Sequence, residues 1–212
     1  GNIKKYDFGY AGLAMVNFPI RPVDASLFDS DVTQVESIEL MAGGDAANQA
    51  ITLSRLGMKV GLLSKRGDDG MGQALDRMLQ GVGVDTAGLV VDAKDSTGVC
   101  AMMIQADGQR HFCTHRGELL RFCADDVDFA MVRGARVVSI GGLMSLPAFD
   151  GSGSERLFSE ARAAGAVTVA DTKKDLWGIG LDGIRATLRQ TDYFFPSYEE
   201  ATVMTGEADP ER

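Results

Sequence analysis

A glycine pair followed by short polar side chains is the segment best suited to bind a small polar ligand. Residues 43–50 read GGDAANQA, and the apolar residues from there to Leu56 recur at helical spacing, with Asp45 expected as the N-cap. Two glycines before a helix let a ligand approach the backbone closely, and the free amides of the first turn can donate to its oxygens. Asn48 adds a donor and an acceptor that suit neighbouring hydroxyls. A glycine loop before a capped helix, with no ligand, is the alternative, and spacing alone leaves both open.

A second polar segment lies at the end of a predicted strand. Asp171, Lys173 and Lys174 directly follow the β-prone residues 167–170. This is the carboxyl end of the strand, where open α/β sheets bind ligands. Lysines at strand ends are usually only solvated, so the position by itself supports both interpretations.

The elements around these segments predict an α/β fold. Residues 6–16 form an apolar run typical of a buried strand ending near Asn17, and residues 32–41 indicate a second extended segment. The β-prone runs 97–105 and 110–116 flank an Asp-Gly turn, which is a strong hairpin signal. Strands and helices then alternate, which predicts parallel strands joined by crossover helices in a doubly wound, mostly parallel sheet.

Composition narrows the classes of partner. The chain has 212 residues, of which 45% are hydrophobic and 24% charged, as in ordinary globular proteins. Its net charge of -9 repels phosphate backbones, so we expect no nucleic-acid partner. No apolar run approaches the roughly 18 residues that cross a bilayer, so we expect no membrane partner and a cytoplasmic location. The three cysteines form no CxxC pair, and we expect reduced thiols.

Several common catalytic motifs are missing from the sequence. There is no Walker lysine motif, no GxGxxG after the first predicted strand and no GxSxG elbow. These absences argue against P-loop, dinucleotide-binding and serine-hydrolase sites. Residues 68–70 read DDG but lack the other acidic positions of an EF-hand, so we expect a turn there.

The segment from Gly43 to Gly72 resembles the N-terminal signature of the ribokinase-like (PfkB-type) carbohydrate kinase family. The resemblance implies a ribokinase-like sheet with a small β-lid, and it implies that Gly43, Gly44 and Asn48 contact sugar hydroxyls. Asp45 falls at a position where family members vary, so the resemblance supports a substrate contact by Asp45 less strongly than by the other three residues. The first family strand commonly ends in an aspartate that holds the sugar, whereas this chain has Asn17, which can bind hydroxyls without the charge.

The hairpin is similar to the family's lid. Lid segments are expected near residues 10–41 and 97–116, with Arg116 reaching the substrate and a possible homodimer forming through the lid strands. His111, Cys113 and His115 alternate and so share one strand face, which resembles a metal tripod. No fourth ligand is evident, and we expect this face to cover the substrate instead.

The resemblance also implies ATP and Mg²⁺ as cofactors. Lys173 matches a position that is often basic in relatives and is expected to steady the transferred phosphate. Residues 196–200 look like the family's Asn-x-x-Glu segment, with Ser197 in place of the asparagine. Ser197 is then expected near the nucleotide phosphates, and Glu200 near magnesium through water, a role that suits a carboxylate. A simple helix start at Glu199 and Glu200 is the alternative.

The family keeps its catalytic base in a C-terminal Gly-Ala-Gly-Asp signature, which is not found up to Arg212. The resemblance therefore implies one ribokinase-like domain over residues 1–212 that is incomplete at its C-terminus. We expect the base beyond Arg212, and no catalytic activity from this chain alone. The implied function is ATP-dependent phosphorylation of a sugar hydroxyl. A nucleoside kinase of the same fold and a non-catalytic sugar-binding or regulatory module remain alternatives.

Overall fold

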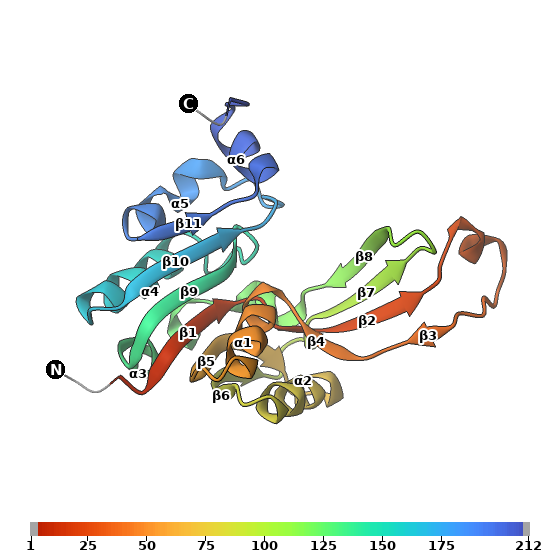
Figure 1. The fold of residues 1–212 in the computed structure, drawn as a ribbon, viewed down its shortest axis with the longest axis horizontal. Helices are drawn as coiled ribbons and strands as arrows, with labels where there is room; N and C mark the ends of the chain where they lie inside the picture. Colours follow the sequence, from red (N-terminus) through yellow and green to blue (C-terminus); the bar gives the residue numbers. More distant parts are fainter. Residues whose placement is uncertain (1–3, 210–212) are drawn as a thin grey trace.

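A parallel six-stranded sheet forms the centre of the molecule (Figure 1). The structure, a computed structural model, describes residues 4–209. All neighbouring strands of this sheet run parallel, as the alternation of strands and helices predicts. In sheet order the strands are β11 (Tyr193–Phe195), β10 (Val167–Thr172), β9 (Ala135–Leu143), β1 (Tyr6–Gly12), β5 (Val60–Gly67) and β6 (Asp85–Asp92).

Helices cover both faces of this sheet. Successive residues of a strand point to opposite faces, so Leu62 packs in one hydrophobic core and Leu63 in the other. One core contains residues of α1 (Asp45–Arg55) and α2 (Gly70–Gly81). The other contains residues of α3 (Phe129–Arg133), α4 (Ser152–Ala163) and α5 (Gly180–Arg189). The doubly wound arrangement is confirmed, and α6 (Tyr198–Thr205) follows β11. Within the described residues, no helix has both the length and the apolar character needed to cross a bilayer.

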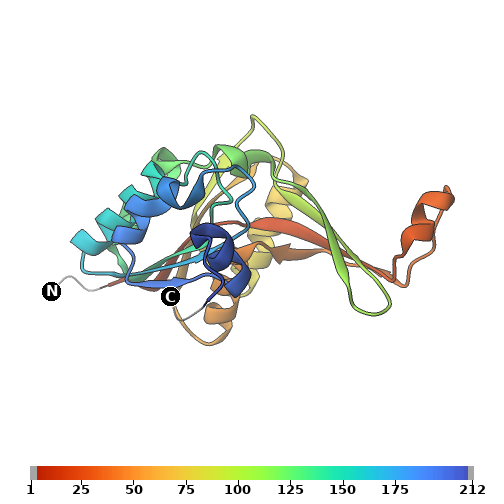
Figure 2. The same ribbon diagram turned by 90° about the horizontal axis from the view of Figure 1, so that it is seen from above.

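A smaller sheet, which we call the lid sheet, projects away from this body (Figures 1 and 2). The hairpin prediction is confirmed, because β7 and β8 pair antiparallel around the Asp-Gly turn. Strand β2 joins this hairpin by a parallel pairing with β7 and pairs antiparallel with β3 and β4. The lid sheet consists of β2 (Met15–Arg21), β3 (Ser37–Ile38), β4 (Met41–Gly43), β7 (Val99–Ile104) and β8 (Arg110–His115).

Two strand predictions near the N-terminus are wrong. The run expected as one strand is divided, since β1 ends at Gly12 and β2 begins at Met15 in the other sheet. Gly12 has φ +136, and a side chain there would overlap the carbonyl of Gly141. This glycine therefore lets the chain pass from one sheet to the other. Of the extended segment expected at 32–41, only β3 and the first residue of β4 are strand.

The helix starts also differ from the sequence prediction. Gly44, not Asp45, is the N-cap of α1, with φ +92, and Asp45 is the first helical residue. Helix α2 begins at Gly70, within the stretch expected to be a turn, because the Asp69 carboxylate accepts a hydrogen bond from the Gly72 amide at 2.8 Å. The start of α1 thus depends on the backbone conformation of Gly44, and the start of α2 depends on a side-chain cap.

Candidate active site

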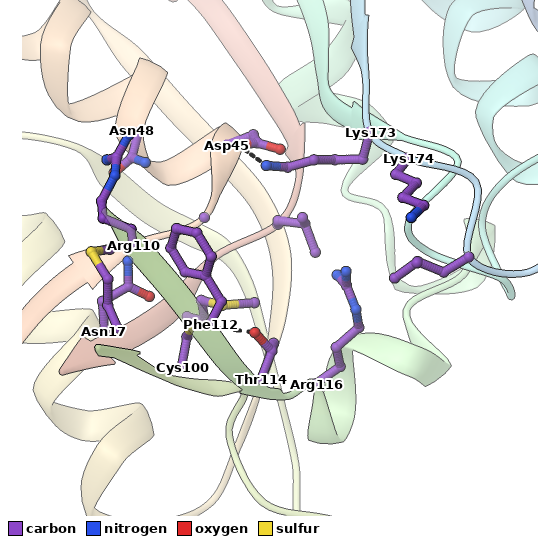
Figure 3. Close-up of a pocket in the computed structure, with 15 residues that line it drawn as sticks. Asn17, Asp45, Asn48, Cys100, Arg110, Phe112, Thr114, Arg116, Lys173 and Lys174 are labelled. Carbon is purple, nitrogen blue, oxygen red and sulfur yellow. Dashed lines mark hydrogen bonds and ion pairs between the residues drawn. The ribbon is translucent and has the colours of Figure 1, made fainter. Parts of the chain in front are cut away.

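A cavity of about 460 Å³, which we call the lid cavity, lies between the start of α1, the lid sheet and the loop after β10 (Figure 3). The lid sheet and α1 supply most of its wall, and the loop after β10 closes one side. The cavity therefore lies where the sequence analysis placed a ligand against the start of the helix. Its lining residues are Leu13, Met15, Asn17, Gly44, Asp45, Asn48, Cys100, Met102, Arg110, Phe112, Thr114, Arg116, Lys173, Lys174 and Leu176.

The start of α1 leaves one amide unused at this cavity. Asp45 lines the cavity, and its amide donates no hydrogen bond to a described residue. The Ala46 amide is buried against Gly141, and that of Ala47 donates to the Leu13 carbonyl at 3.1 Å. A side chain at Gly44 would lie 2.5 Å from that same carbonyl oxygen. Glycine is required at Gly44 for two reasons, its positive φ and this close approach of the backbone.

Gly43 has a different role from the one expected of it. It does not line the lid cavity, and a β-carbon at this position would overlap the amide of Asn17. Gly43 therefore makes room for the Asn17 side chain, which does line the cavity. The Oδ1 atom of Asn17 is buried and has no hydrogen-bond partner among the described residues. Asn48 also lines the cavity, and its contact with a sugar stays a prediction.

Asp45 and Lys173 meet across the cavity. The Lys173 ammonium lies 3.3 Å from Asp45 Oδ1, as the dashed line in Figure 3 shows. The other oxygen, Asp45 Oδ2, is buried without a hydrogen-bond partner in the described part of the chain. The sequence gave no indication of this pair, because its members lie 128 positions apart.

The face of the lid that covers the cavity is not the face that we expected. Phe112 and Thr114 line the cavity, whereas the neighbouring positions His111, Cys113 and His115 do not. Side chains alternate along a strand, so the His-Cys-His row points to the opposite side. No group of three or more His, Cys, Asp or Glu residues among those described is placed to hold a metal ion.

Arg116 directly follows β8 and lines the cavity, and its contact with a substrate stays a prediction. Burial lowers the pKa of its guanidinium, while the negative charges of Asp45 and Asp150 oppose this shift. The group nevertheless stays charged, as arginine does in proteins. Its Nη1 atom is buried and has no hydrogen-bond partner among the described residues.

A second cavity of about 220 Å³, which we call the α6 cavity, adjoins the first. Lys173 and Lys174 line both cavities, whereas Ser197 and Glu200 line only this one. Ser197 and Glu200 form a capping box: Ser197 Oγ accepts from the Glu200 amide at 3.2 Å, and Glu200 Oε2 accepts from the Ser197 amide at 2.8 Å. Glu200 Oε2 also accepts from the Thr172 hydroxyl at 2.9 Å. The helix-start interpretation of this segment therefore holds, together with its place on a cavity wall.

Comparison with known sequences agrees with this architecture. The profile described as pfkB family carbohydrate kinase matches residues 11–212, which is nearly the whole chain. The chain belongs to this family.

Individual proteins are similar to this chain in sequence or in fold. A stretch of 139 residues is 31% identical to fructokinase-1 from Zea mays, covering 64% of this chain and 43% of that protein. The crystal structure of a PfkB protein from Polaromonas sp. JS666 superposes with a TM-score of 0.80 at 27% identity, covering 97% of this chain and 70% of that one. Arabidopsis thaliana ribokinase, solved with ribose and ATP, shares the fold with a TM-score of 0.75 at 22% identity, covering 95% of this chain and 63% of that one. The match to the curated fructokinase thus spans less than half of that protein's length.

Asp171 is a half-buried carboxylate that we did not single out as a site residue, although it begins a segment that we did. Burial raises the pKa of this carboxyl, while hydrogen bonds from the Gly142 amide and the Gln49 side chain oppose the shift. These contacts tie β9 and α1 to the end of β10. The position of an aspartate at the end of a predicted strand was the only sequence signal for Asp171. Its hydrogen-bond partners could not be predicted, because Gln49 and Gly142 are remote in sequence.

Asp150 is a second such residue. Burial raises its pKa to about 6, although the carboxylate accepts hydrogen bonds from the Leu146 amide at 2.8 Å and the Met144 amide at 3.1 Å. Arg110 and Lys174 were likewise not predicted as site residues, yet both line the lid cavity. Strand alternation identifies Arg110 only once the inward face of β8 is known.

Proposed function

We propose that this chain provides the sugar-binding part of an ATP-dependent sugar kinase that transfers the γ-phosphoryl group to a sugar hydroxyl. The observation that carries the proposal is the lid cavity, where the unused amide of Asp45 and the side chains of Asn17 and Asn48 meet under the lid sheet. Hydroxyl groups need such mixed donors and acceptors. Membership of the pfkB carbohydrate kinase family supports the same reaction class.

In this proposal the described residues mainly position the reactants. The acceptor oxygen forms a bond to the γ-phosphorus as the bond from that phosphorus to the ADP oxygen breaks, and a base takes the hydroxyl proton. Asn17, Gly44 and Asn48 orient the acceptor, and Lys173 steadies the transferred phosphoryl group. Closing of the lid sheet over the acceptor would exclude water and protect that group from hydrolysis.

ATP and Mg²⁺ are the cofactors that we propose. Mg²⁺ is usually held through water and phosphate oxygens, with one or two carboxylates, so it needs no cage of protein ligands. Glu200 fits this role, because Oε2 is used within the capping box and Oε1 accepts no hydrogen bond from a described residue. The cation would neutralise charge on the phosphates. We place the catalytic base beyond Arg212, outside the described residues.

The proposal is tested with the full-length gene product that contains this chain. Sugars and nucleosides are supplied with ATP and Mg²⁺, and ADP release is followed. We expect sugar-dependent ADP release that EDTA abolishes, and a KM for the sugar raised about tenfold in Asn48→Ala. The matched control is Arg189→Ala, since Arg189 is exposed, lies outside both cavities and should leave KM unchanged.

Other outcomes would decide against the sugar kinase. ADP release with nucleosides alone would indicate a nucleoside kinase, and sugar binding without ADP release would indicate a non-catalytic module. We further propose a cytoplasmic protein that dimerises through the lid sheet. A monomeric mass by light scattering would contradict the dimer.

A further inference from the structure

The charges on the wall of the lid cavity are opposite in sign to those of the chain as a whole. The chain carries 30 acidic and 21 basic residues. Of the charged side chains that line the lid cavity, four are cations and one is an anion: Arg110, Arg116, Lys173, Lys174 and Asp45. A neutral sugar needs hydrogen-bond donors and acceptors but no excess of positive charge. The excess therefore requires an explanation in the ligand.

Three of these cations form no ion pair with the described residues. Lys173 pairs with Asp45, but the side chains of Arg110, Arg116 and Lys174 make no salt bridge or hydrogen bond to any residue from 4 to 209. Arg110 and Lys174 are exposed and keep their hydration, whereas Arg116 is half-buried. A charge withdrawn from water is ordinarily paired, because an unpaired charge loses hydration without compensation, and Arg116 is such a charge.

Arg116 is the most informative of the three. It is partly buried, and its Nη1 atom is shut off from solvent without a hydrogen-bond partner among the described residues. Asp45 and Asp150 attract it electrostatically, yet neither lies within 4.0 Å. Removing a donor from water without pairing it costs free energy, which an anion bound between these groups would recover.

The two arginines line the lid cavity but not the α6 cavity. Lys173 and Lys174 border the α6 cavity as well, so they can serve the phosphates of the donor. Arg110 and Arg116 border only the lid cavity, where Asn17 contributes an uncharged amide. In the view of Figure 3, Arg110 lies on the side of Asn17 and Asn48, whereas Arg116 lies on the side of Lys173 and Lys174. The two guanidinium groups therefore border the proposed acceptor site from opposite sides.

We infer that the acceptor is itself an anion, a polyol that carries a carboxylate or a phosphate, and that Arg116 selects it with assistance from Arg110. The inference rests on the proposed function, in that it takes the lid cavity to be the acceptor site. A guanidinium matches both anions with paired N–H donors, and such charge-assisted hydrogen bonds are stronger than neutral ones. Carboxylate and phosphate share this chemistry, so the experiment distinguishes them.

The test measures binding and turnover of matched ligands by the full-length gene product. One set is glucose, gluconate and glucose 6-phosphate, and the other is ribose, ribonate and ribose 5-phosphate. Calorimetry gives the Kd of each ligand. A saturating non-hydrolysable ATP analogue is present, so that the phosphate subsite of the donor is already filled. ADP release with ATP gives turnover. We expect an anionic member to bind at least tenfold more tightly than its neutral partner. Preference for the acid identifies a carboxylate, and preference for the phosphate ester identifies a phosphate.

Charge-removing variants connect this preference to the arginines. Arg116→Gln should raise Kd for the preferred anion about 10- to 100-fold, and Arg110→Gln by less, with the neutral partner changed less than twofold. Arg189→Gln is the control and should change neither, while circular dichroism verifies folding of each variant. Equal weakening of the neutral and anionic ligands by Arg116→Gln would overturn the inference.

The outcomes separate this inference from the proposed function. Tighter binding and turnover of neutral sugars than of every anion would overturn the inference and leave the sugar kinase standing. Arg116-dependent binding of an anion without ADP release from any acceptor would support the inference and overturn the kinase. If no anion binds more tightly than its neutral partner, the inference is wrong whatever the turnover.

Discussion

The lid cavity and the α6 cavity share two lysines but use their polar groups differently. In the α6 cavity, Ser197 and Glu200 satisfy each other's backbone amides and begin α6. In the lid cavity, Asn17 Oδ1, Asp45 Oδ2 and Arg116 Nη1 are buried without a hydrogen-bond partner among the described residues. Groups of the first kind stabilise the fold, whereas groups of the second kind cost stability until something binds.

This comparison teaches that stability and binding should respond to mutation in opposite ways in the two regions. Polar side chains of the α6 cavity should contribute to the free energy of unfolding. Polar side chains of the lid cavity should contribute little to it and much to ligand affinity. Gly44 is an expected exception, because its backbone is packed against Leu13.

The largest effect is expected at this exception. Gly44→Ala should lower the free energy of unfolding by about 3 kcal/mol, because it combines left-handed backbone strain with overlap on the Leu13 carbonyl. Gly57→Ala is the matched control, since Gly57 has a similar φ of +88 and open space around its β-carbon position. It should cost about 1 kcal/mol. Urea denaturation measures both, and equal losses would show that the overlap carries no cost.

A pH-dependent effect is expected at Asp150, beside the two cavities. Its pKa of about 6 in the folded state exceeds the ordinary 3.8, so the folded protein holds this proton more firmly than the unfolded chain. Stability is therefore lost as the pH rises from about 4 to above 6, by on the order of 2 kcal/mol. Asp150→Asn stays neutral, and its free energy of unfolding relative to wild type should rise over this range by that amount.

The control for this prediction is a carboxylate with the opposite shift. Partial burial opposes ionisation of Asp69, but hydrogen bonds from Thr97 and Gly72 lower its pKa. Asp69→Asn should therefore lose stability relative to wild type at neutral pH, with the loss shrinking as the pH falls through the acid range. Denaturation at a series of pH values measures both variants. A flat difference curve for Asp150→Asn would mean that this carboxyl titrates normally.

A smaller effect is expected in the α6 cavity. Ser197→Ala removes the side-chain cap of α6 and should lower the free energy of unfolding by about 1 kcal/mol. Ser197→Asn keeps a good N-cap and should stay close to wild type. Thermal or urea denaturation decides this. A neutral Ser197→Ala would remove the distinction between the two cavities.

The smallest effect on stability is expected at Asn17. Its side chain makes no hydrogen bond to the described residues, so Asn17→Ala should change the free energy of unfolding by less than about 0.5 kcal/mol. The Kd for the acceptor should nevertheless rise about tenfold. Denaturation and calorimetry on the same preparation test both statements. A large loss of stability would place Asn17 among the structural residues.

Local sequence predicted the parts of the site that depend on neighbouring residues. The glycine pair before Asn48, the hairpin around its Asp-Gly turn and the strand ending before Lys173 are all present as expected. The division of the first strand at Gly12 was missed, because a glycine within an apolar run gives no sign of its φ. The outward direction of His111 was missed because a period of two marks two faces without saying which is inside.

The sequence by itself determined the α/β alternation, the glycine-led start of α1 and the polar residues that follow it, since these depend on interactions within a few positions. The tertiary structure alone decided that Gly43 makes room for Asn17, that Asp45 takes Lys173 as its partner and that Arg116 has no partner among residues 4–209. The physical reason is that hydrogen bonding and charge pairing depend on distances between segments that only the packed sheets bring together.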